Sequence, residues 1–225
     1  MFEILRSLFS DPEVWEVTRL SLSVSGLSTL ISVLLGLPLG TALAMKRFPG
    51  RSLLLTVINT GMALPPVVVG LAVAMSLWRS GFLGGLNLIY TPSAIVIAQT
   101  IISAPVVTGL TVTAIQQVDQ RLEQQLLGIG ASAIQVVLTL WWQCRLSLLA
   151  AIMAGFGSVI SEVGASMMVG GNISGHTRVL TTAIVLETNK GEFDRAIVLG
   201  VFLLAITLLI NFALTWIQQK GVRRQ

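Results

Sequence analysis

Charged residues, cysteine and histidine are all scarce in this sequence. Aspartate, glutamate, lysine and arginine together make up 11% of the 225 residues, whereas an ordinary soluble domain has about 25%. Cys144 and His176 are each the only residue of their type. The sequence therefore has too few cysteines for an internal disulfide or a cysteine metal cluster, and only one histidine for a Ser-His-Asp triad. The composition excludes a water-soluble globular domain, and we expect no catalytic residues and no metal ligands.

Apolar residues are abundant instead. They make up 54% of the chain, the mean hydropathy is +0.85, and residues 20–45, 52–78 and 196–219 contain no charge at all. Each of these runs exceeds the ~20 apolar residues that cross a bilayer as a helix. The sequence predicts one all-α membrane domain over residues 1–225, with about five transmembrane helices. No length is left for an enzymatic domain, so any energy source belongs to another subunit.

The stretch between residues 124 and 161 is the hardest to divide into spans, because Arg145 is its only charged residue. One continuous helix from 126 to 169 would be roughly 65 Å long, about twice the ~30 Å hydrocarbon core. No turn-forming residue lies near Arg145, so we expect the chain to bend at the glycines of 128–132. The predicted spans are residues 17–45, 53–78, 93–115, 145–164 and 196–217, with a cytoplasmic loop at about 116–135.

The cations indicate the orientation of these spans. The net charge is +4, but the cations sit at the ends of apolar runs, which indicates membrane anchors in contact with lipid and no nucleic-acid surface. With five spans and the N-terminus outside, the C-terminus is cytoplasmic and eight of the 14 lysines and arginines are inside. These eight are Lys46, Arg47, Arg51, Arg121, Arg145, Lys220, Arg223 and Arg224. Trp141, Trp142 and Arg145 are expected to form an inner interfacial belt.

One polar segment carries a family resemblance. Residues 123–132 read Glu-Gln-Gln-Leu-Leu-Gly-Ile-Gly-Ala-Ser and resemble the EAA loop of ABC-transporter permeases, although bulkier residues replace the two alanines. The resemblance implies a type I ABC importer permease fold, in which this loop docks into a cleft of the ATP-binding subunit. It assigns coupling to the ATPase to Glu123, Gln124, Gln125, Gly130, Ala131 and Ser132.

Three further stretches, 63–70, 162–166 and 171–178, resemble the tungstate, molybdate and sulfate importers of that family, and 177–193 looks most like tungstate permeases. The resemblance implies a multi-pass inner-membrane permease that works as a homodimer. Its implied partners are two ATP-binding cassette subunits and an extracytoplasmic tungstate-binding protein. ATP and Mg²⁺ would bind the partner ATPase, and this chain would hold no cofactor and would not be an enzyme.

Two alternatives to tungstate import stand beside this hypothesis. Molybdate and sulfate are tetrahedral and doubly charged like tungstate, so an importer of either is the nearer alternative. The more distant one is an ATPase-independent secondary transporter or channel. Against it, the sequence has no pair of intramembrane carboxylates for ion coupling and no internal repeat.

Two helix-breaking stretches are candidates for the translocation path. Pro65 and Pro66 remove two backbone donors and disrupt the helix of the second span, which fits either a pathway wall or a structural kink. Glu162 lies near the outer end of the fourth span, where an acid would repel an oxyanion. It is therefore a candidate gate or a structural hydrogen-bonding group. The small residues that accompany it are Gly164, Ala165 and Ser166.

The polar stretch after Gly171 is expected on the outer face. Asn172, His176 and Arg178 are candidates for contact with the binding protein, and a solvated polar loop is the alternative. No span carries a lysine or arginine at its centre. The path therefore has no obvious tight anion site, which suits release of a divalent anion.

Overall fold

The computed structural model describes residues 12–222, and within that range it contains helices and turns but no β-strand. This confirms the expected all-helical fold; Arg223 and Arg224, expected in the cytoplasm, lie outside the described residues. The helices are α2 (Pro12–Met45), α3 (Arg51–Met62), α4 (Pro66–Leu77), α5 (Pro92–Gln116), α6 (Gln120–Gly128), α7 (Ala133–Gln143), α8 (Arg145–Ile160), α9 (Gly164–Gly170), α10 (Leu180–Lys190) and α11 (Phe193–Val222), and a 3-10 turn, η1 (Gly84–Leu86), precedes α5.

The apolar helices account for up to five membrane crossings. Three helices, α2, α5 and α11, are each long and apolar enough to span a bilayer. Two further pairs pass the same test together but are bent, α3 with α4 by 102° and α7 with α8 by 76°. If each bent pair is one span, the described residues contain five spans, and the fourth covers both α7 and α8.

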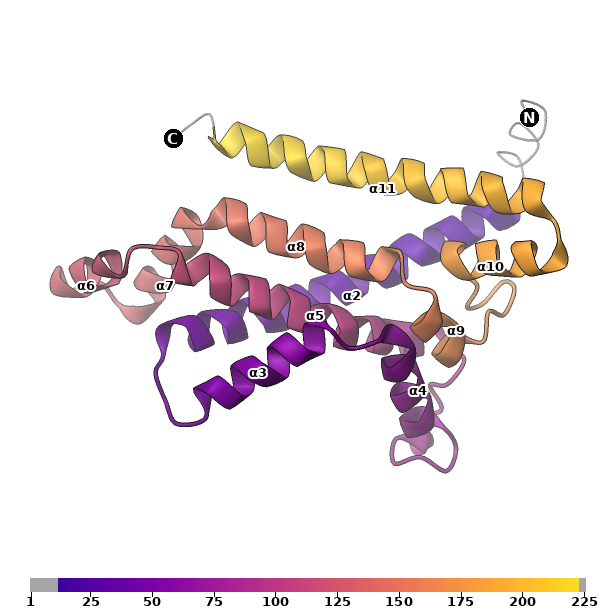
Figure 1. The fold of residues 1–225 in the computed structure, drawn as a ribbon, viewed down its shortest axis with the longest axis horizontal. Helices are drawn as coiled ribbons and strands as arrows, with labels where there is room; N and C mark the ends of the chain where they lie inside the picture. Colours follow the sequence, from indigo (N-terminus) through magenta and orange to yellow (C-terminus); the bar gives the residue numbers. More distant parts are fainter. Residues whose placement is uncertain (1–11, 223–225) are drawn as a thin grey trace.

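The long helices give the molecule two distinct ends (Figure 1). Helices α2, α5, α8 and α11 run along the long axis, with α6 and α7 at one end and α10 at the other. The end of α11 lies on the side of α6 and α7, and the start of α2 lies on the side of α10. Helix α4 leaves this bundle at a steep angle, and α9 packs beside it.

Small residues bring α2 and α5 together along most of their length. Ser25, Ser28, Ser32, Gly36 and Gly40 recur every three or four residues along α2 and are all buried. A Cβ atom on Gly40 would lie 2.8 Å from the carbonyl oxygen of Thr108 on α5. Such close approach supplies the van der Waals contact that holds membrane helices together, where the hydrophobic effect is absent.

Two breaks in the helices face each other. Helix α3 ends at Met62 and α4 begins at Pro66, so the chain leaves the helix where the proline pair predicts. The second break separates α8 from α9 and contains Glu162. A Cβ atom on Gly164, the first residue of α9, would lie 2.5 Å from Val67 Cγ2 on α4. The breaks are far apart in sequence but adjacent in space.

The chain between residues 116 and 160 bends more often than expected. Helix α5 continues through Gln116, the short polar helix runs from Gln120 to Gly128, and the chain turns again before α7. The expectation that no turn lies near Arg145 is wrong, because the helix axis bends by 76° at Cys144. No glycine or proline marks this bend. Val136, Leu140 and Leu148, from both sides of it, are buried in one cluster with Ile115 of α5, so tertiary packing produces it.

Candidate functional site

The EAA-like segment forms a helical hairpin whose ends are fixed by local hydrogen bonds. Asp119 caps α6, since its Oδ1 accepts the backbone N–H of Arg121 at 2.9 Å. After α6, Gly130 has a φ of +84°, which favours glycine because a Cβ would be strained there. Ser132 begins α7, donating its N–H and its hydroxyl to Gln135 Oε1 at 2.8 and 3.1 Å. The hairpin therefore has a defined shape.

The hairpin exposes both polar and large apolar side chains. Gln124, Gln125 and Ser132 are exposed, and Glu123 and Ala131 are partly buried. Leu127 is 54% exposed and Ile129 is 83% exposed, close to the exposure of an isolated side chain. Leu127 lies in the last turn of α6, and Ile129 follows its last residue. Sequence reasoning did not single out Ile129, although an isoleucine between two glycines of a polar segment is a detectable signal.

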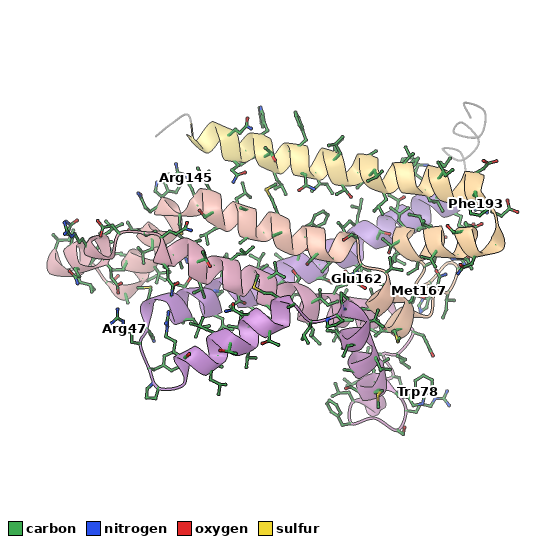
Figure 2. The ribbon with its side chains drawn as sticks, in the orientation of Figure 1. Arg47, Trp78, Arg145, Glu162, Met167 and Phe193 are labelled. Carbon is green, nitrogen blue, oxygen red and sulfur yellow. The ribbon has the colours of Figure 1, made fainter. Side chains whose placement is uncertain are left out.

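Two hollows lie on either side of α6. One, of about 570 Å³, is lined by residues of α5, α6 and the bend at Cys144, among them Arg121 and Gln125. The other, of about 270 Å³, is lined by Glu123 and Gln124 of α6 and by Arg47 from the turn after α2. Figure 2 shows Arg47 and Arg145 at the end of the molecule that carries α6 and α7. The basic turn after α2 and the α6–α7 hairpin therefore share one surface.

Helix α7 connects the hairpin to the transmembrane bundle. Trp141 donates its indole N–H to Thr41 Oγ1 of α2 at 2.8 Å. Trp142 is 69% exposed, and the Arg145 guanidinium carbon lies 4.5 Å from the centre of its ring. The expected belt of three residues is therefore divided, because Trp141 turns inward to α2 while Trp142 and Arg145 stack at the surface.

Apolar side chains surround the proline break at residues 63–66. Leu64, Val67 and Val68 are between 42% and 54% exposed, although they adjoin the centre of the bundle. Pro66 occupies the first turn of α4, where its missing N–H leaves no intrahelical bond unmade. Helix α3 contains no buried residue. This face of the described chain is therefore uncovered by the chain itself.

Glu162 makes a structural hydrogen bond at the break between α8 and α9. Its side chain is largely buried, and its Oε1 accepts the backbone N–H of Ala165 at 2.9 Å, so the carboxylate caps α9. Its carbonyl oxygen accepts the Thr181 hydroxyl at 2.9 Å. Gly164 and Ala165 pack against α4, since a Cβ on Gly70 would lie 2.6 Å from Ala165 Cα. The start of α9, which Glu162 caps, therefore packs against the start of α4 after the proline break.

The three outer candidates have different surroundings. Arg178 donates to Glu13 at 2.6 Å, and Arg195 donates to the same carboxylate at 2.8 Å. The amide nitrogen of Asn172 donates to a backbone carbonyl of α10 at 3.4 Å. His176 is exposed. Arg178 and Asn172 thus join the segment before α10 to α2 and α10, and His176 is the exposed member of the three.

The pKa of Glu13 is shifted by its surroundings, which include Arg178 and Arg195. It lies before the predicted first span, in the first turn of α2. Burial raises its pKa, but the hydrogen bond from Arg178 and the charges of Arg195 and Arg178 outweigh burial, so the pKa lies below the usual value for a glutamate. The carboxylate is therefore charged at neutral pH.

Buried polar contacts between helices were not anticipated from the sequence. The Ser21 hydroxyl oxygen of α2 accepts the backbone N–H of Leu180 at 2.7 Å. This N–H, at the first residue of α10, has no partner within its own helix. Gln99 of α5 is 2% exposed and bonds to three other elements. Neither residue belongs to a motif. Among residues 12–222, no group of three or more His, Cys, Asp and Glu is placed to hold a metal ion.

Comparisons with known proteins agree with this arrangement. Residues 36–224 match the protein family described as binding-protein-dependent transport system inner membrane component. A probable anion ABC transporter permease protein of Haloferax volcanii is 40% identical over 200 residues, which cover 87% of this chain and 86% of that protein. The tungstate uptake system permease protein TupB of Peptoclostridium acidaminophilum is 37% identical over 210 residues, or 93% and 92% of the two chains.

More distant relatives extend the comparison. The molybdenum transport system permease protein ModB of Escherichia coli is 31% identical over 229 residues, covering 96% of this chain and 100% of that protein. A bacterial ABC transporter that imports the acidic polysaccharide alginate has a chain with a TM-score of 0.82 to this fold. That alignment covers 97% of this chain and 83% of the other at 18% identity.

The fold is that of type I ABC importer permeases, and the chain is a transport subunit rather than an enzyme. Its apolar helices agree with a place in the inner membrane. The match over residues 36–224 covers most of the sequence and includes both helix breaks and the α6–α7 hairpin. This chain therefore belongs to the family of binding-protein-dependent transport system inner membrane components.

Proposed function

We propose that this chain is the permease subunit of an ATP-driven importer that moves tungstate from an extracytoplasmic binding protein into the cytoplasm. The observation that carries the proposal is the 37% identity to a tungstate uptake permease over 93% of the chain. Relatives named for molybdenum and sulfate transport are less similar, at 31% and 26% identity. An oxyanion is thus the common cargo of these relatives, and molybdate or sulfate import is the alternative.

The α6–α7 hairpin is the proposed docking element for the ATPase. Glu123, Gln124, Gln125, Gly130, Ala131 and Ser132 would contact the partner, and the exposed Leu127 and Ile129 offer the apolar part of the interface. ATP and Mg²⁺ would bind the partner subunit, so this chain contributes motion and no bond chemistry. The fixed shape of the hairpin supports this role, because a rigid element transmits a displacement to the helices attached to it.

The proposed orientation puts the hairpin in the cytoplasm. Arg47, Arg121 and Arg145 all belong to the end of the molecule that carries α6 and α7, which favours the cytoplasmic side by the positive-inside rule. The start of α2 then lies outside and the end of α11 inside. Residues 17–45, 53–78, 93–115, 145–164 and 196–217 remain the proposed spans of a single domain, with 116–135 in the cytoplasm.

The proposed path runs where the two helix breaks meet. Pro65, Pro66, Glu162, Gly164, Ala165 and Ser166 would line or gate it, with Glu162 holding α9 in place. The uncovered face of α3 supports a homodimer, because a second copy would bury apolar side chains that this chain leaves exposed. Two such copies would enclose one path above two ATPase subunits. Asn172, His176 and Arg178 mark the outer surface proposed to meet the binding protein.

A purified complex tests the proposal. The chain would be isolated in mild detergent from its native membranes, its partners counted, and ATP hydrolysis measured with the binding protein loaded with tungstate, molybdate or sulfate. We expect two permeases with two ATPase subunits, and the strongest stimulation by the tungstate-loaded form. Stronger stimulation by another anion contradicts the choice of tungstate. A chain that purifies without a nucleotide-binding partner contradicts the ATP-driven mechanism and favours a secondary transporter.

A further inference from the structure

The side-chain amide of Gln99 is buried between the helices, next to the break between α8 and α9. Gln99 of α5 is 2% exposed, and its neighbours Ser28 and Ser166 are 0% and 1% exposed. Burial of an amide costs free energy unless its donors and acceptor find partners. A leucine at this position would have packed between the helices without that requirement. Apolar packing alone therefore does not explain why a glutamine occupies this position.

Each polar group of the Gln99 amide has a partner on a different element. Oε1 lies 3.3 Å from the Ser28 hydroxyl on α2, whose single proton is also directed to the Val24 carbonyl at 2.7 Å. Nε2 donates to the carbonyl of Val159 in the last turn of α8 at 3.2 Å, and to Ser166 Oγ in α9 at 3.4 Å. The amide therefore has polar contacts with three elements, and its Nε2 makes the two that reach α8 and α9.

The two Nε2 bonds span the break that contains Glu162. Val159 precedes the break and Ser166 follows it, so one rigid amide group holds the end of α8 and the start of α9 at a set separation. The carboxylate of Glu162 caps α9 between them, and Gly164 packs against Val67 beside the proline break. A change in the Gln99 bonds would therefore alter the contact between the two breaks.

We propose that Gln99 is a positioning residue of the translocation path, which holds the α8–α9 break in register with α2 and α5. Hydrogen bonds suit this task because they can exchange partners when helices move, whereas a close-packed apolar contact resists displacement. The inference rests on the proposed import function. It adds to that function a residue outside the motifs, whose role is exerted through Val159 and Ser166 and without contact with the anion.

The chain offers a matched control one turn along α5. Ser103 is 0% exposed and donates to the carbonyl of Gly155 on α8 at 3.2 Å, so it also joins α5 to α8 through a buried hydrogen bond. Gly155 lies before the break, in the continuous part of α8. S103A therefore removes a similar bond without acting across the break.

The test uses the whole complex in liposomes, with Q99M, S166A and S103A compared for initial oxyanion uptake and for ATP hydrolysis. Methionine has the length of glutamine but cannot form these bonds. We expect Q99M to lower uptake per ATP hydrolysed about tenfold, the scale of losing both Nε2 hydrogen bonds within a membrane protein. S166A, which removes one bond, should lower it about twofold to threefold, and S103A should keep the wild-type ratio. A wild-type ratio in Q99M or S166A overturns the inference, as does an equal loss in S103A.

A second measurement does not depend on transport. Ser161 is exposed within the break, and S161C in a C144S background gives a single thiol for maleimide labelling. If Gln99 holds the break, adding Q99M should raise the labelling rate about threefold or more, and adding S103A should leave it unchanged; the scale again follows from the lost bonds. Equal labelling with and without Q99M contradicts the inference. A wild-type complex that takes up none of the three oxyanions contradicts the proposed function instead, and the labelling still tests Gln99.

Discussion

Gly130 has a backbone conformation on which the turn between α6 and α7 depends. Its φ of +84° is in the left-handed region, where a side chain with a branched Cβ is strained. The space around Gly130 is open, since no atom lies within 4 Å of a built Cβ. The requirement for glycine is therefore conformational and not steric. A substitution at this position would strain the turn without causing a clash with other residues of the chain.

Substitution at Gly130 should uncouple the permease from its ATPase. G130V should distort the turn between α6 and α7 at a cost of about 1–2 kcal/mol and move the exposed hairpin residues relative to one another. We expect copurification of the ATPase and anion-stimulated hydrolysis to fall at least about fivefold, as expected for a loss of that size. The control is G128A, because Gly128 is helical and open space surrounds its built Cβ. Wild-type coupling in G130V would contradict the assigned role of the hairpin.

At the scale of elements, a single carboxylate ties three segments together at the end of the molecule opposite α6. Glu13 begins α2, Arg178 precedes α10 and Arg195 begins α11, and both guanidinium groups donate to that carboxylate. The side chain of Glu13 is 34% exposed, so solvent screening limits the contribution of these pairs to stability. These pairs join the start of α2 to α11 and to the segment before α10.

The pH dependence of stability should report this cluster. Because the pKa of Glu13 is lowered by folding, its stabilisation is present above the ordinary glutamate value of about 4.3 and is lost as pH falls through the lowered folded pKa. At pH 7, E13Q should lower Tm by about 1–3 °C. The difference from wild type should shrink below about pH 4. E16Q is the matched control, since Glu16 is an exposed carboxylate one turn along α2. A pH-independent difference, or an equal effect of E16Q, would exclude the ion-pair explanation.

The orientation of the whole molecule rests on the two ends of the bundle. Ser132 begins α7 at the end that carries α6, and Ser174 is exposed in the polar stretch before α10 at the opposite end. The proposed topology puts Ser132 in the cytoplasm and Ser174 outside. The two serines therefore provide opposite reporters of sidedness, each at an exposed position.

Labelling of intact cells should distinguish the two orientations. In a C144S background, S174C should react with a membrane-impermeant maleimide and S132C should react only after permeabilisation, because a charged reagent does not cross the hydrocarbon core. Permeabilised cells serve as the control for reactivity at both positions. Labelling of S132C in intact cells, without labelling of S174C, would reverse the proposed topology.

Several features of the whole molecule follow from local sequence. The uncharged runs predict α2, α5 and α11, because a helix is the simplest way to satisfy backbone groups in a bilayer. Pro65 and Pro66 predict the break between α3 and α4, since two adjacent prolines remove two backbone donors, whereas α2 and α5 continue through the single prolines Pro38 and Pro105. The resemblance at residues 123–132 predicts a polar segment between spans, and α6 lies there. These signals involve residues close together in the chain.

Other features depend on contacts between residues that are distant in sequence. The bend at Cys144 has no helix breaker and arises where Val136, Leu140 and Leu148 pack against α5. The meeting of Gly164 with Val67, and the bonds of Gln99 to Ser28 and Ser166, join segments between 67 and 97 residues apart.

The sequence by itself therefore determined the helical membrane class and the polar segment that forms α6, because hydropathy and proline act on neighbouring residues. The tertiary structure decided which buried polar groups meet, how Arg178 is paired and where α8 bends. Those outcomes depend on how the helices approach one another, and small residues such as Gly40 and Gly164 allow approaches that no local pattern specifies.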